Sequence, residues 1–419
     1  MKHVILGNGP AGVIAAETLR KRSPDDEIVM IGCEDAPPYS RMAIPYLLMG
    51  NIQESGTYLR KEPDYFEKLK IQQIRGKAVS LDPKAKKLAL EGGGGQIEYD
   101  KLLIATGSVP VRPPIPGIEL PGVHFCWTLE DARSITKLAK PGSRVLQMGA
   151  GFIGCIILEA LASRKVELTV VEMGDRMVPR MMTPVAGGMI KKWVEQKGVQ
   201  VYTETKVEGI AQTSNGLSVK LSNGKSLEVD LVISATGVKP NIEYLNSSGL
   251  ALEVGVLVDD CMRTSHSDIY AAGDVTESID FSTGHRIVNA IQPNAVEQAR
   301  IAAINMSGGQ TQSLGALQIN ILDTLGLIST SFGLWSGAKG GDYVEDIDLD
   351  RYKYLRLEFL GDVLVGATCV GNTEHIGVLR GLIQGKVALG KWKKTLLEEP
   401  TKATEAYLAQ GQAQSTWMN

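Results

Sequence analysis

The sequence predicts an α/β protein in which one strand–glycine loop–helix–strand unit occurs twice, followed by a smaller α+β region. Three observations support this prediction: a repeated glycine pattern, the similar way in which the two copies end, and a change to alternating strands after about residue 314. Hydrophobic residues form 43% of the 419-residue chain and charged residues 22%. These values are ordinary for a globular protein with a large core.

The first copy begins at the start of the chain. It reads as an apolar strand at residues 3–6, the loop Gly7-Asn-Gly9-Pro-Ala-Gly12, a helix to about Arg22, a strand at residues 27–31 and an acid, Glu34. The second copy reads as a strand at residues 144–148, the loop Gly149-Ala-Gly151-Phe-Ile-Gly154, a helix to about Ser163, a strand at residues 167–171 and an acid, Glu172. In each copy the acid lies about 20 residues beyond the last glycine, which is the spacing of a dinucleotide-binding fingerprint.

The two copies also end alike. The first runs into a hairpin, with strands at 87–90 and 97–99, and then into the segment that ends Ala105-Thr106-Gly107. The second runs into a hairpin at Asn223-Gly224, a pair that favours a type I′ turn, and then into a segment that ends Ala-Thr236-Gly237. One glycine loop alone is a weak signal. Two loops in matching surroundings predict two Rossmann-like domains.

The glycines and the acids have separate roles in such a unit. The first glycine permits the sharp turn, the second lets the backbone approach a pyrophosphate, and the third lets the helix pack on the strand. The phosphates then meet the free N–H groups of the helix N-terminus. An acid at the end of the second strand accepts hydrogen bonds from a ribose diol and repels a 2′-phosphate. Glu172 therefore favours NADH over NADPH, although Arg176 and Arg180 lie nearby.

The remainder of the chain differs from both copies. Residues 352–360 and 363–370 read as antiparallel strands around Gly361-Asp362. A helix is expected to start near Asn372 or Thr373, and the last 30 residues read as a loosely attached helix or tail.

The bulk composition limits the classes of partner and site. The net charge of −3 indicates neither a nucleic-acid nor a membrane partner. No apolar run is long enough to span a bilayer, and the first strand leaves no room for a signal peptide, so a cytoplasmic location is expected. The five scattered cysteines show no CxxC or CxxxxC pattern. We therefore expect no disulfide framework, no metal site and no Fe–S cluster held by this chain.

Further motifs resemble a known family. Gly273-Asp274 follows a short apolar run, and the segment Asn289-Ala-Ile-Gln-Pro293-Asn-Ala295-Val-Glu-Gln298 follows in turn. Together with the two loops, they resemble the pyridine nucleotide–disulfide oxidoreductase superfamily, whose members bind FAD at the first loop and NAD(P)H at the second. The resemblance implies a split FAD domain (1–110 and 240–312), an inserted NAD domain (111–239) and a C-terminal interface domain (313–419).

The resemblance also assigns roles to individual residues. It implies that Asp274 bonds the ribityl chain of FAD, and that the helix beginning near Pro293 stabilises the anionic reduced flavin. The residues expected at the FAD site are Gly7, Gly9, Pro10, Ala11, Gly12, Glu34, Arg41, Ala105, Thr106, Gly107, Gly273, Asp274, Pro293, Asn294 and Ala295. Those expected at the NAD site are Gly149, Gly151, Phe152, Ile153, Gly154, Glu172, Thr236 and Gly237.

The redox cysteines that define other branches of the family are absent. A single-cysteine branch places its cysteine before Leu-Pro-Tyr, and here Met42 stands at that point, before Ile44-Pro45-Tyr46. The stretch Pro38-Tyr-Ser-Arg41 is similar to the branch of rubredoxin reductases, ferredoxin reductases and nitrite reductase flavin domains. Arg41 is then expected near the flavin or its pyrophosphate.

One departure from the family concerns the second loop. The family commonly has Gly-x-x-Gly-x-Glu, with the glutamate close to the nicotinamide, whereas Ile156 stands at that position here. Binding of the phosphate end need not suffer, but slow NADH turnover or net NAD reduction is expected.

The function that the sequence predicts is FAD-dependent electron transfer between NAD(H) and an Fe–S protein or an Fe–S subunit of a larger complex. An example is the NAD-reducing flavin subunit of an aldehyde oxidoreductase-type complex. The site needs no catalytic side chain, because the cofactors carry the hydride chemistry. A homodimer or a hetero-oligomer through the C-terminal domain is compatible with this prediction. Two alternatives stay open: a stand-alone NADH oxidase or quinone reductase, and a non-catalytic flavoprotein that senses NADH.

Overall fold

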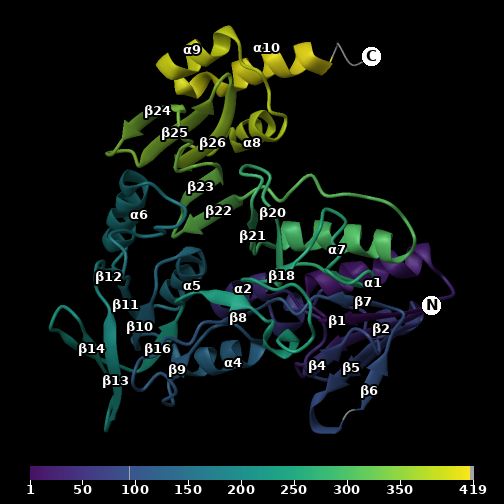
Figure 1. The fold of residues 1–419 in the computed structure, drawn as a ribbon. Helices are drawn as coiled ribbons and strands as arrows, with labels where there is room; N and C mark the ends of the chain where they lie inside the picture. The colour runs from purple at the N-terminus through teal and green to yellow at the C-terminus, as the bar shows by residue number, and fades with distance from the viewer. Residues whose placement is uncertain (94, 416–419) are drawn as a thin grey trace. The chain divides into compact units, whose positions relative to one another are not determined.

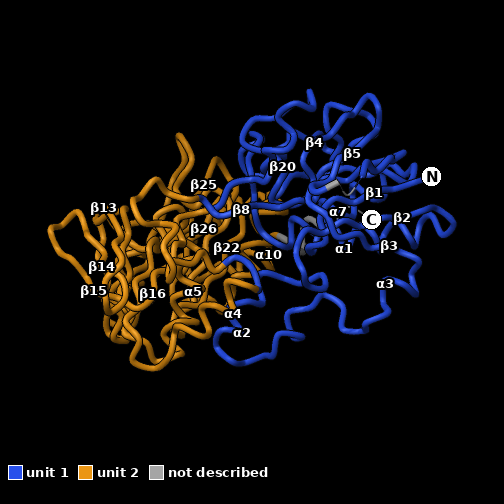
Figure 2. Tube along the Cα trace, turned by 90° about the horizontal axis from the view of Figure 1, so that it is seen from below, with its two compact units in different colours: residues 1–111, 127–129, 238–316 blue, residues 112–126, 130–237, 317–419 orange. Residues whose placement is uncertain are grey.

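The computed structural model describes residues 1–93 and 95–415. They divide into two compact units, coloured separately in Figure 2. Unit 1 comprises residues 1–111, 127–129 and 238–316, and unit 2 comprises residues 112–126, 130–237 and those from 317 onward. The predicted boundaries near 110 and 240 lie close to the limits of unit 1. Residues from 317 onward cluster with the second glycine loop, so their separation as a third domain stays a prediction.

A five-stranded parallel sheet forms the centre of unit 1 (Figure 1). Its order is β19-β7-β1-β2-β3, with bounds β1 (Lys2–Leu6), β2 (Glu27–Gly32), β3 (Ile71–Arg75), β7 (Lys101–Ile104) and β19 (Ile269–Ala271). Val4, Ile5 and Leu103 are fully buried, so both faces of the sheet are covered. Strands covered on both faces are apolar along their whole length, which explains the short apolar runs in the sequence. Helices α1 (Pro10–Arg22) and α7 (Gln292–Met306) run side by side. The chain leaves β1 toward β2 and returns to β7, so the topological switch point lies between β1 and β7.

Short elements complete unit 1. They are helices α2 (Ile44–Met49) and α3 (Tyr65–Lys68), and strands β4 (Ala78–Asp82), β5 (Lys87–Leu90), β6 (Gln96–Glu98), β8 (Ser108–Pro110), β17 (Val238–Pro240), β18 (Val256–Leu257), β20 (Thr276–Ile279) and β21 (Arg286–Ile287). The predicted first hairpin is confirmed, since β5 and β6 pair antiparallel with Leu88 opposite Ile97. Residue 94 of its turn lies outside the described residues.

The same parallel arrangement recurs in unit 2. The sheet order is β12-β11-β10-β16-β9, with bounds β9 (Val123–His124), β10 (Arg144–Met148), β11 (Glu167–Val171), β12 (Gln200–Tyr202) and β16 (Leu231–Ser234). Its helices are α4 (Leu129–Leu138), α5 (Phe152–Ser163) and α6 (Pro184–Gln196). The switch point here lies between β10 and β16. The predicted repeat is therefore confirmed as two doubly wound folds.

The second hairpin is present, but its turn differs from the prediction. It belongs to a three-stranded sheet of β13 (Val207–Thr213), β14 (Gly216–Leu221) and β15 (Ser226–Val229). A type I′ turn needs positive φ at both central residues, and here Gly224 has φ +84° while Asn223 does not adopt a positive φ. The amide of Gly224 donates to the carbonyl of Leu221. The loop is thus one residue longer, with glycine taking the only left-handed position.

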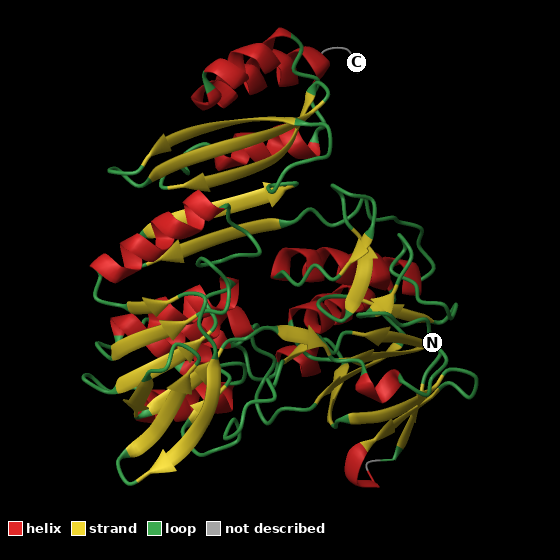
Figure 3. Cartoon of the chain, turned by 60° about the vertical axis from the view of Figure 1, so that its left-hand side comes forward, coloured by secondary structure: helices red, strands yellow, loops and turns green. Residues whose placement is uncertain are grey.

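The C-terminal part of unit 2 is a five-stranded antiparallel sheet (Figure 3). Its order is β22-β23-β26-β25-β24, with bounds β22 (Ile319–Thr324), β23 (Leu327–Gly333), β24 (Asp342–Asp348), β25 (Lys353–Leu360) and β26 (Val363–Val370). The two strands predicted around Gly361-Asp362 are confirmed as β25 and β26. The sheet packs on the second doubly wound fold, where the hydroxyls of Thr183 and Tyr354 lie 2.9 Å apart.

Three helices follow this sheet: α8 (Ile376–Gln384), α9 (Lys391–Glu398) and α10 (Ala403–Ser415). The expected helix start near Asn372 or Thr373 is wrong, because α8 begins at Ile376 after His375. The apolar side chains that anchor α8, such as Leu379 and Leu382, begin only there. The tail contains α9 and α10, and residues 416–419 lie outside the described residues. Within the part of the chain that the structure describes, the helices lack the length or the apolar run that a membrane span requires.

Candidate functional site

The first glycine loop joins β1 to α1 at the switch point of unit 1. Gly7 has φ +120°, and a Cβ there would lie 2.0 Å from the carbonyl oxygen of Ala105. A Cβ on Gly12 would lie 1.9 Å from the carbonyl oxygen of Gly7. Neither position can hold another residue without displacing backbone. The two outer glycines therefore do what the sequence predicted, which is to pack strand, loop and helix tightly.

The middle glycine faces open space. No heavy atom of the described chain comes within 4 Å of a Cβ built on Gly9. Gly9 is also the N-cap of α1, and no side chain of the described residues caps that helix. The first amides of α1, next to Pro10 and Ala11, are thus available to an anion, and the helix dipole favours negative charge there.

An acid–aromatic–arginine cluster lies on the side of this loop where the ribose was expected. The carboxylate of Glu34 accepts hydrogen bonds from the Tyr39 hydroxyl at 2.5 Å and from the Arg41 guanidinium at 2.7 Å. Arg41 also donates to the carbonyl of Trp127 at 2.6 Å and lies over its ring. Burial raises the pKa of Tyr39, so this hydroxyl keeps its proton and acts as a donor to Glu34. The predicted residues Glu34 and Arg41 are therefore in direct contact.

Asp274 lies at the carboxyl end of β19 and faces the segment after Thr106-Gly107. Ser108 donates its hydroxyl to the Asp274 carboxylate at 2.8 Å, and the indole N–H of Trp127 donates to the Ser108 carbonyl at 3.1 Å. Burial raises the pKa of Asp274. Sequence reasoning missed Ser108 and Trp127, because only the folded chain brings their segments next to Asp274 and Arg41. It also missed Tyr39, which lies close to Glu34 and Arg41 in the sequence but belongs to no motif that assigns it a role.

The end of the strand before Asp274 is held by the side-chain amide of Gln298. Gly273 has φ +85°, and its N–H donates to the side-chain oxygen of Gln298 on α7 at 2.8 Å. This bond joins the strand end to α7, whose first turn contains Pro293, Asn294 and Ala295. The N-terminus of α7 has no side-chain cap among the described residues, and the buried Nδ2 of Asn294 has no partner there. An unpaired buried donor, uncapped helix amides and the open side of Gly9 fit a bound dinucleotide.

The second loop has the same geometry in unit 2. Gly149 has φ +96°, and a Cβ there would lie 2.4 Å from the carbonyl oxygen of Ala235, just before Thr236 and Gly237. A Cβ on Gly154 would lie 2.4 Å from the carbonyl oxygen of Gly149. Gly151 is the uncapped N-cap of α5, and within the described chain nothing lies within 4 Å of its Cβ position. Phe152 and Ile153 form the first turn that follows.

Glu172 lies at the end of β11, as predicted, and already has two backbone partners. Its carboxylate accepts from the amide of Ala150 at 2.7 Å and from the amide of Gly174 at 2.8 Å. A carboxylate has about four acceptor positions, so two remain for a ribose diol. Arg176 is turned toward Asp175, Pro179 and Met182. Arg176 is therefore engaged within the chain.

The thiols show no redox arrangement. All five cysteines are free, and Cys126, Cys155 and Cys369 are buried. Burial raises the pKa of the Cys155 thiol to about 12, which suppresses the reactive thiolate. Met42, at the position of the redox cysteine in other branches, is 48% exposed.

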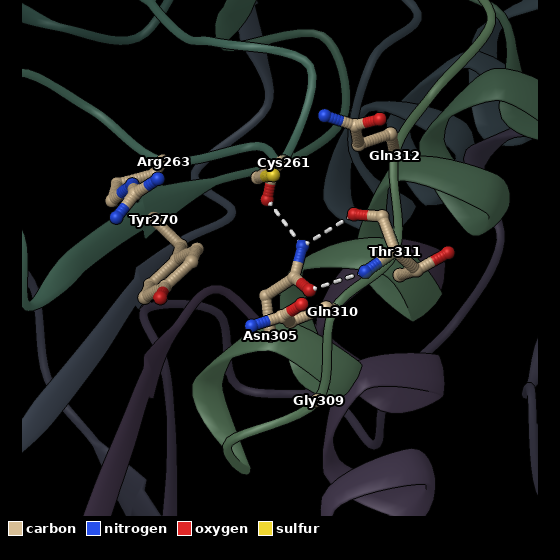
Figure 4. Close-up of a pocket in the computed structure, with 8 residues that line it drawn as sticks. All are labelled: Cys261, Arg263, Tyr270, Asn305, Gly309, Gln310, Thr311 and Gln312. Carbon is tan, nitrogen blue, oxygen red and sulfur yellow. Dashed lines mark hydrogen bonds between the residues drawn. The ribbon is translucent and has the colours of Figure 1, made fainter.

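A separate pocket of about 630 Å³ lies in unit 1 beside β19 and the end of α7 (Figure 4). The side chain of Asn305 bonds the backbone of Cys261 and Thr311, as Figure 4 shows. Arg263 pairs with Asp259. These side chains stabilise the walls of the pocket. None of the residues predicted at the cofactor sites lines it.

Two uncapped glycine loops on two doubly wound folds, with the partly buried Asp274 near the first, are typical of a two-dinucleotide flavoprotein. The family model for pyridine nucleotide-disulphide oxidoreductase matches residues 1–302. The chain therefore belongs to the pyridine nucleotide-disulphide oxidoreductase family. It is an NAD(H)-dependent oxidoreductase that contains FAD.

The chain is similar to several named members of this family. The chain is 31% identical over 415 residues to the NADH-dependent phenylglyoxylate dehydrogenase subunit epsilon of Aromatoleum evansii, covering 98% of this chain and 97% of the relative. It is 34% identical to the NADH oxidase of Methanocaldococcus jannaschii, over 74% of this chain and 70% of the relative. Among solved structures, the NAD-dependent persulfide reductase from A. fulgidus has a TM-score of 0.85 at 30% identity, and the match covers 93% of this chain and 78% of the reductase. Further relatives are named as rubredoxin, ferredoxin and nitrite reductases.

Proposed function

We propose that this protein is the flavin subunit of a multi-subunit oxidoreductase and moves electrons between NAD(H) and an Fe–S subunit. The observation that carries the proposal is the likeness to the phenylglyoxylate dehydrogenase subunit epsilon, which extends over 98% of the chain. The NADH oxidase named above matches only 74% of it. The name of the first relative describes one subunit of a larger enzyme.

The chemistry of the chain supports an external electron partner. Met42 stands where the family resemblance implies a redox cysteine, and Cys126, Cys155 and Cys369 are buried. Cys33 is exposed, but it lies beside Glu34, on the adenosine side of the proposed FAD site, so we infer that no thiol of the chain accepts electrons from the flavin. The described cysteines also form no cluster that could hold Fe–S. Electrons that reach the flavin must then leave to another molecule.

The assignments of the two sites belong to this proposal. Bound FAD supplies hydride acceptance from NADH and one-electron release. The amides of α1 after Gly9 hold its pyrophosphate, Glu34 and Arg41 hold its adenosine side, and Asp274 holds the ribityl chain. The N-terminus of α7 stabilises negative charge on the reduced ring. In unit 2, the amides after Gly151 hold the pyrophosphate of NADH and Glu172 its ribose.

The C-terminal sheet and helices α8–α10 are proposed to form the partner interface. The name of the first relative implies association with other subunits. The net direction of electron flow in such a complex is from substrate to NAD, which agrees with the absence of a carboxylate at Ile156.

The test is affinity purification of the tagged chain from its native organism, with identification of the proteins that co-elute at constant stoichiometry. The proposal expects at least one protein with Fe–S cysteine motifs and an optical spectrum of Fe–S clusters in the eluate. Recovery of the chain alone, with flavin and full NADH oxidase activity in air, would instead support the oxidase alternative. That alternative rests on the 34% identity to the NADH oxidase.

A further inference from the structure

A buried glutamine lies beneath the second glycine loop. Gln147 is in β10, two residues before Gly149, and its side chain is fully buried. Its amide nitrogen donates to the carbonyl of Gly149 at 2.9 Å and to the carbonyl of Gly154 at 2.9 Å. One side chain thus joins the first and third glycines of the loop and uses both of its N–H groups.

The orientation of this amide is determined by its surroundings. Rotating it by 180° would bring its oxygen against two carbonyl oxygens, which is repulsive, so the nitrogen must face the loop. The oxygen of Gln147 is then buried, and it has no partner among residues 1–93 and 95–415. An unpaired buried acceptor destabilises a fold. An apolar residue would avoid that loss, so packing alone does not account for a glutamine here.

The first glycine loop provides an internal comparison. Ile5 occupies the equivalent place in β1, since it pairs with Met30 and Leu103 as Gln147 pairs with Val170 and Ile233. A Cβ on Gly12 would lie 3.4 Å from Cγ2 of Ile5, and a Cβ on Gly154 would lie 3.1 Å from the amide nitrogen of Gln147. The same position is therefore apolar under the first loop and a hydrogen-bond donor under the second.

Two other bonds hold the second loop. The amide of Ala150 donates to Glu172 at 2.7 Å, and the carbonyl of Ala150 accepts from the amide of Val178 at 2.8 Å. Val178 is β-branched and has φ +50°, an uncommon conformation for such a residue. With Gln147, these bonds constrain both ends and the middle of the loop. The backbone that carries the N–H groups beginning at Gly151 is therefore anchored at three points of the loop.

We propose that Gln147 is a positioning residue for the nicotinamide nucleotide: it fixes the spacing between Gly149 and Gly154, so that the pyrophosphate meets preorganised amides. This inference rests on the proposed assignment of the second loop to NAD(H). A preformed site loses less conformational freedom on binding, and the gain appears as affinity. Gln147 contacts the backbone beneath the loop, so its effect falls on binding of the ADP-ribose half and not on hydride transfer.

The test compares Gln147→Met, which keeps the side-chain volume without the donor, and Gln147→Ile, which copies the first loop. Met148→Leu, a buried apolar change in the same strand, is the matched control. We expect both Gln147 variants to raise the Kd for ADP-ribose and the KM for NADH about 5- to 20-fold, because the loop must then lose conformational freedom when the nucleotide binds. For both Gln147 variants, the kcat and the FAD content should stay within about twofold of wild type, and the Tm within about 2 °C. Met148→Leu should match wild type in all of these measurements.

Gly151→Val distinguishes a failure of the NAD(H) site assignment from a failure of the role proposed for Gln147. The position is open within the described chain, so valine folds there but blocks the approach of a pyrophosphate. If Gly151→Val binds ADP-ribose normally, the loop is not the nucleotide site and the site assignment fails. If Gly151→Val loses binding while both Gln147 variants bind like wild type, only the inference about Gln147 is overturned. A fall in FAD content or Tm that parallels the loss of affinity would also overturn it, because the role would then be structural.

Discussion

Ser108 donates its hydroxyl to the carboxylate of Asp274 across 2.8 Å, joining the end of the first Ala-Thr-Gly segment to the Gly-Asp motif 166 residues later. Through Ser108 the carboxylate is also linked to Trp127, and through Trp127 to Arg41. The acid assigned to FAD is thus part of a hydrogen-bonded chain that extends toward Glu34.

Asp274→Ala should weaken FAD binding about 10- to 100-fold, because a charged hydrogen bond to the cofactor is lost. The measurement is fluorescence titration of apoprotein with FAD. Asp259→Ala, at an acid remote from the glycine loop, serves as control and should bind FAD normally. Full flavin occupancy of Asp274→Ala after gel filtration would contradict the assignment.

Removing the charge of Asp274 should stabilise the apoprotein. Burial raises the folded-state pKa of this carboxyl above the unfolded value of about 4. The folded state then holds the proton more tightly than the unfolded state, so stability falls as pH rises from the unfolded pKa through the folded pKa. Asp274→Asn does not titrate. Its apoprotein should melt about 1–3 °C higher than wild type at pH 7 and at the same temperature below about pH 4. Equal melting temperatures at both pH values would show that the buried charge is not destabilising.

Arg41 should not be replaceable by lysine. Its planar guanidinium pairs with Glu34 and lies over Trp127, and an ammonium cannot reproduce both contacts. Since the pair is partly exposed, we expect a moderate loss of FAD affinity, about 3- to 10-fold, for Arg41→Lys. The exposed pair of Arg75 with Asp35 provides the control, and Arg75→Lys should have no effect. Unchanged affinity in Arg41→Lys would show that charge alone is required.

The choice between NADH and NADPH should depend on Glu172. Its carboxylate repels a 2′-phosphate and also holds the loop through Ala150. Wild-type flavin should be reduced faster by NADH than by NADPH under anaerobic conditions, and Glu172→Ala should narrow that preference about tenfold or more. Faster bleaching by NADPH in the wild type would refute the specificity argument.

Ile156→Glu should introduce the carboxylate that the family resemblance implies near the nicotinamide. If the missing carboxylate slows the reaction, this variant should speed flavin reduction by NADH about 3- to 10-fold in stopped-flow measurements. Ile156→Val, which keeps an apolar residue, should react like wild type. An unchanged rate in Ile156→Glu would mean that the isoleucine does not limit hydride transfer.

Most of the fold could be read from local patterns. The glycines at positions 7, 12, 149 and 154 have no alternative residue, so they mark the loops directly in the sequence. The turn type of the second hairpin could not be predicted reliably, because Asn-Gly is compatible with more than one hairpin turn. The first residue of α8 could not be predicted either, because packing onto the sheet determines where that helix begins. The contacts of Ser108, Trp127 and Gln147 could not be predicted. Ser108 and Trp127 contact segments that meet only when the chain folds, whereas Gln147 bonds a loop two and seven residues away, and no sequence motif marks that side chain as a partner of the loop.

Electron transfer to an Fe–S protein is tested most directly by NADH oxidation with the purified, FAD-loaded chain, measured in air and then anaerobically with an added rubredoxin or ferredoxin. We expect slow oxygen consumption and a rate that rises in proportion to the Fe–S protein, whose visible spectrum should change to that of its reduced form. Fast oxygen consumption that the Fe–S protein does not change would contradict this expectation.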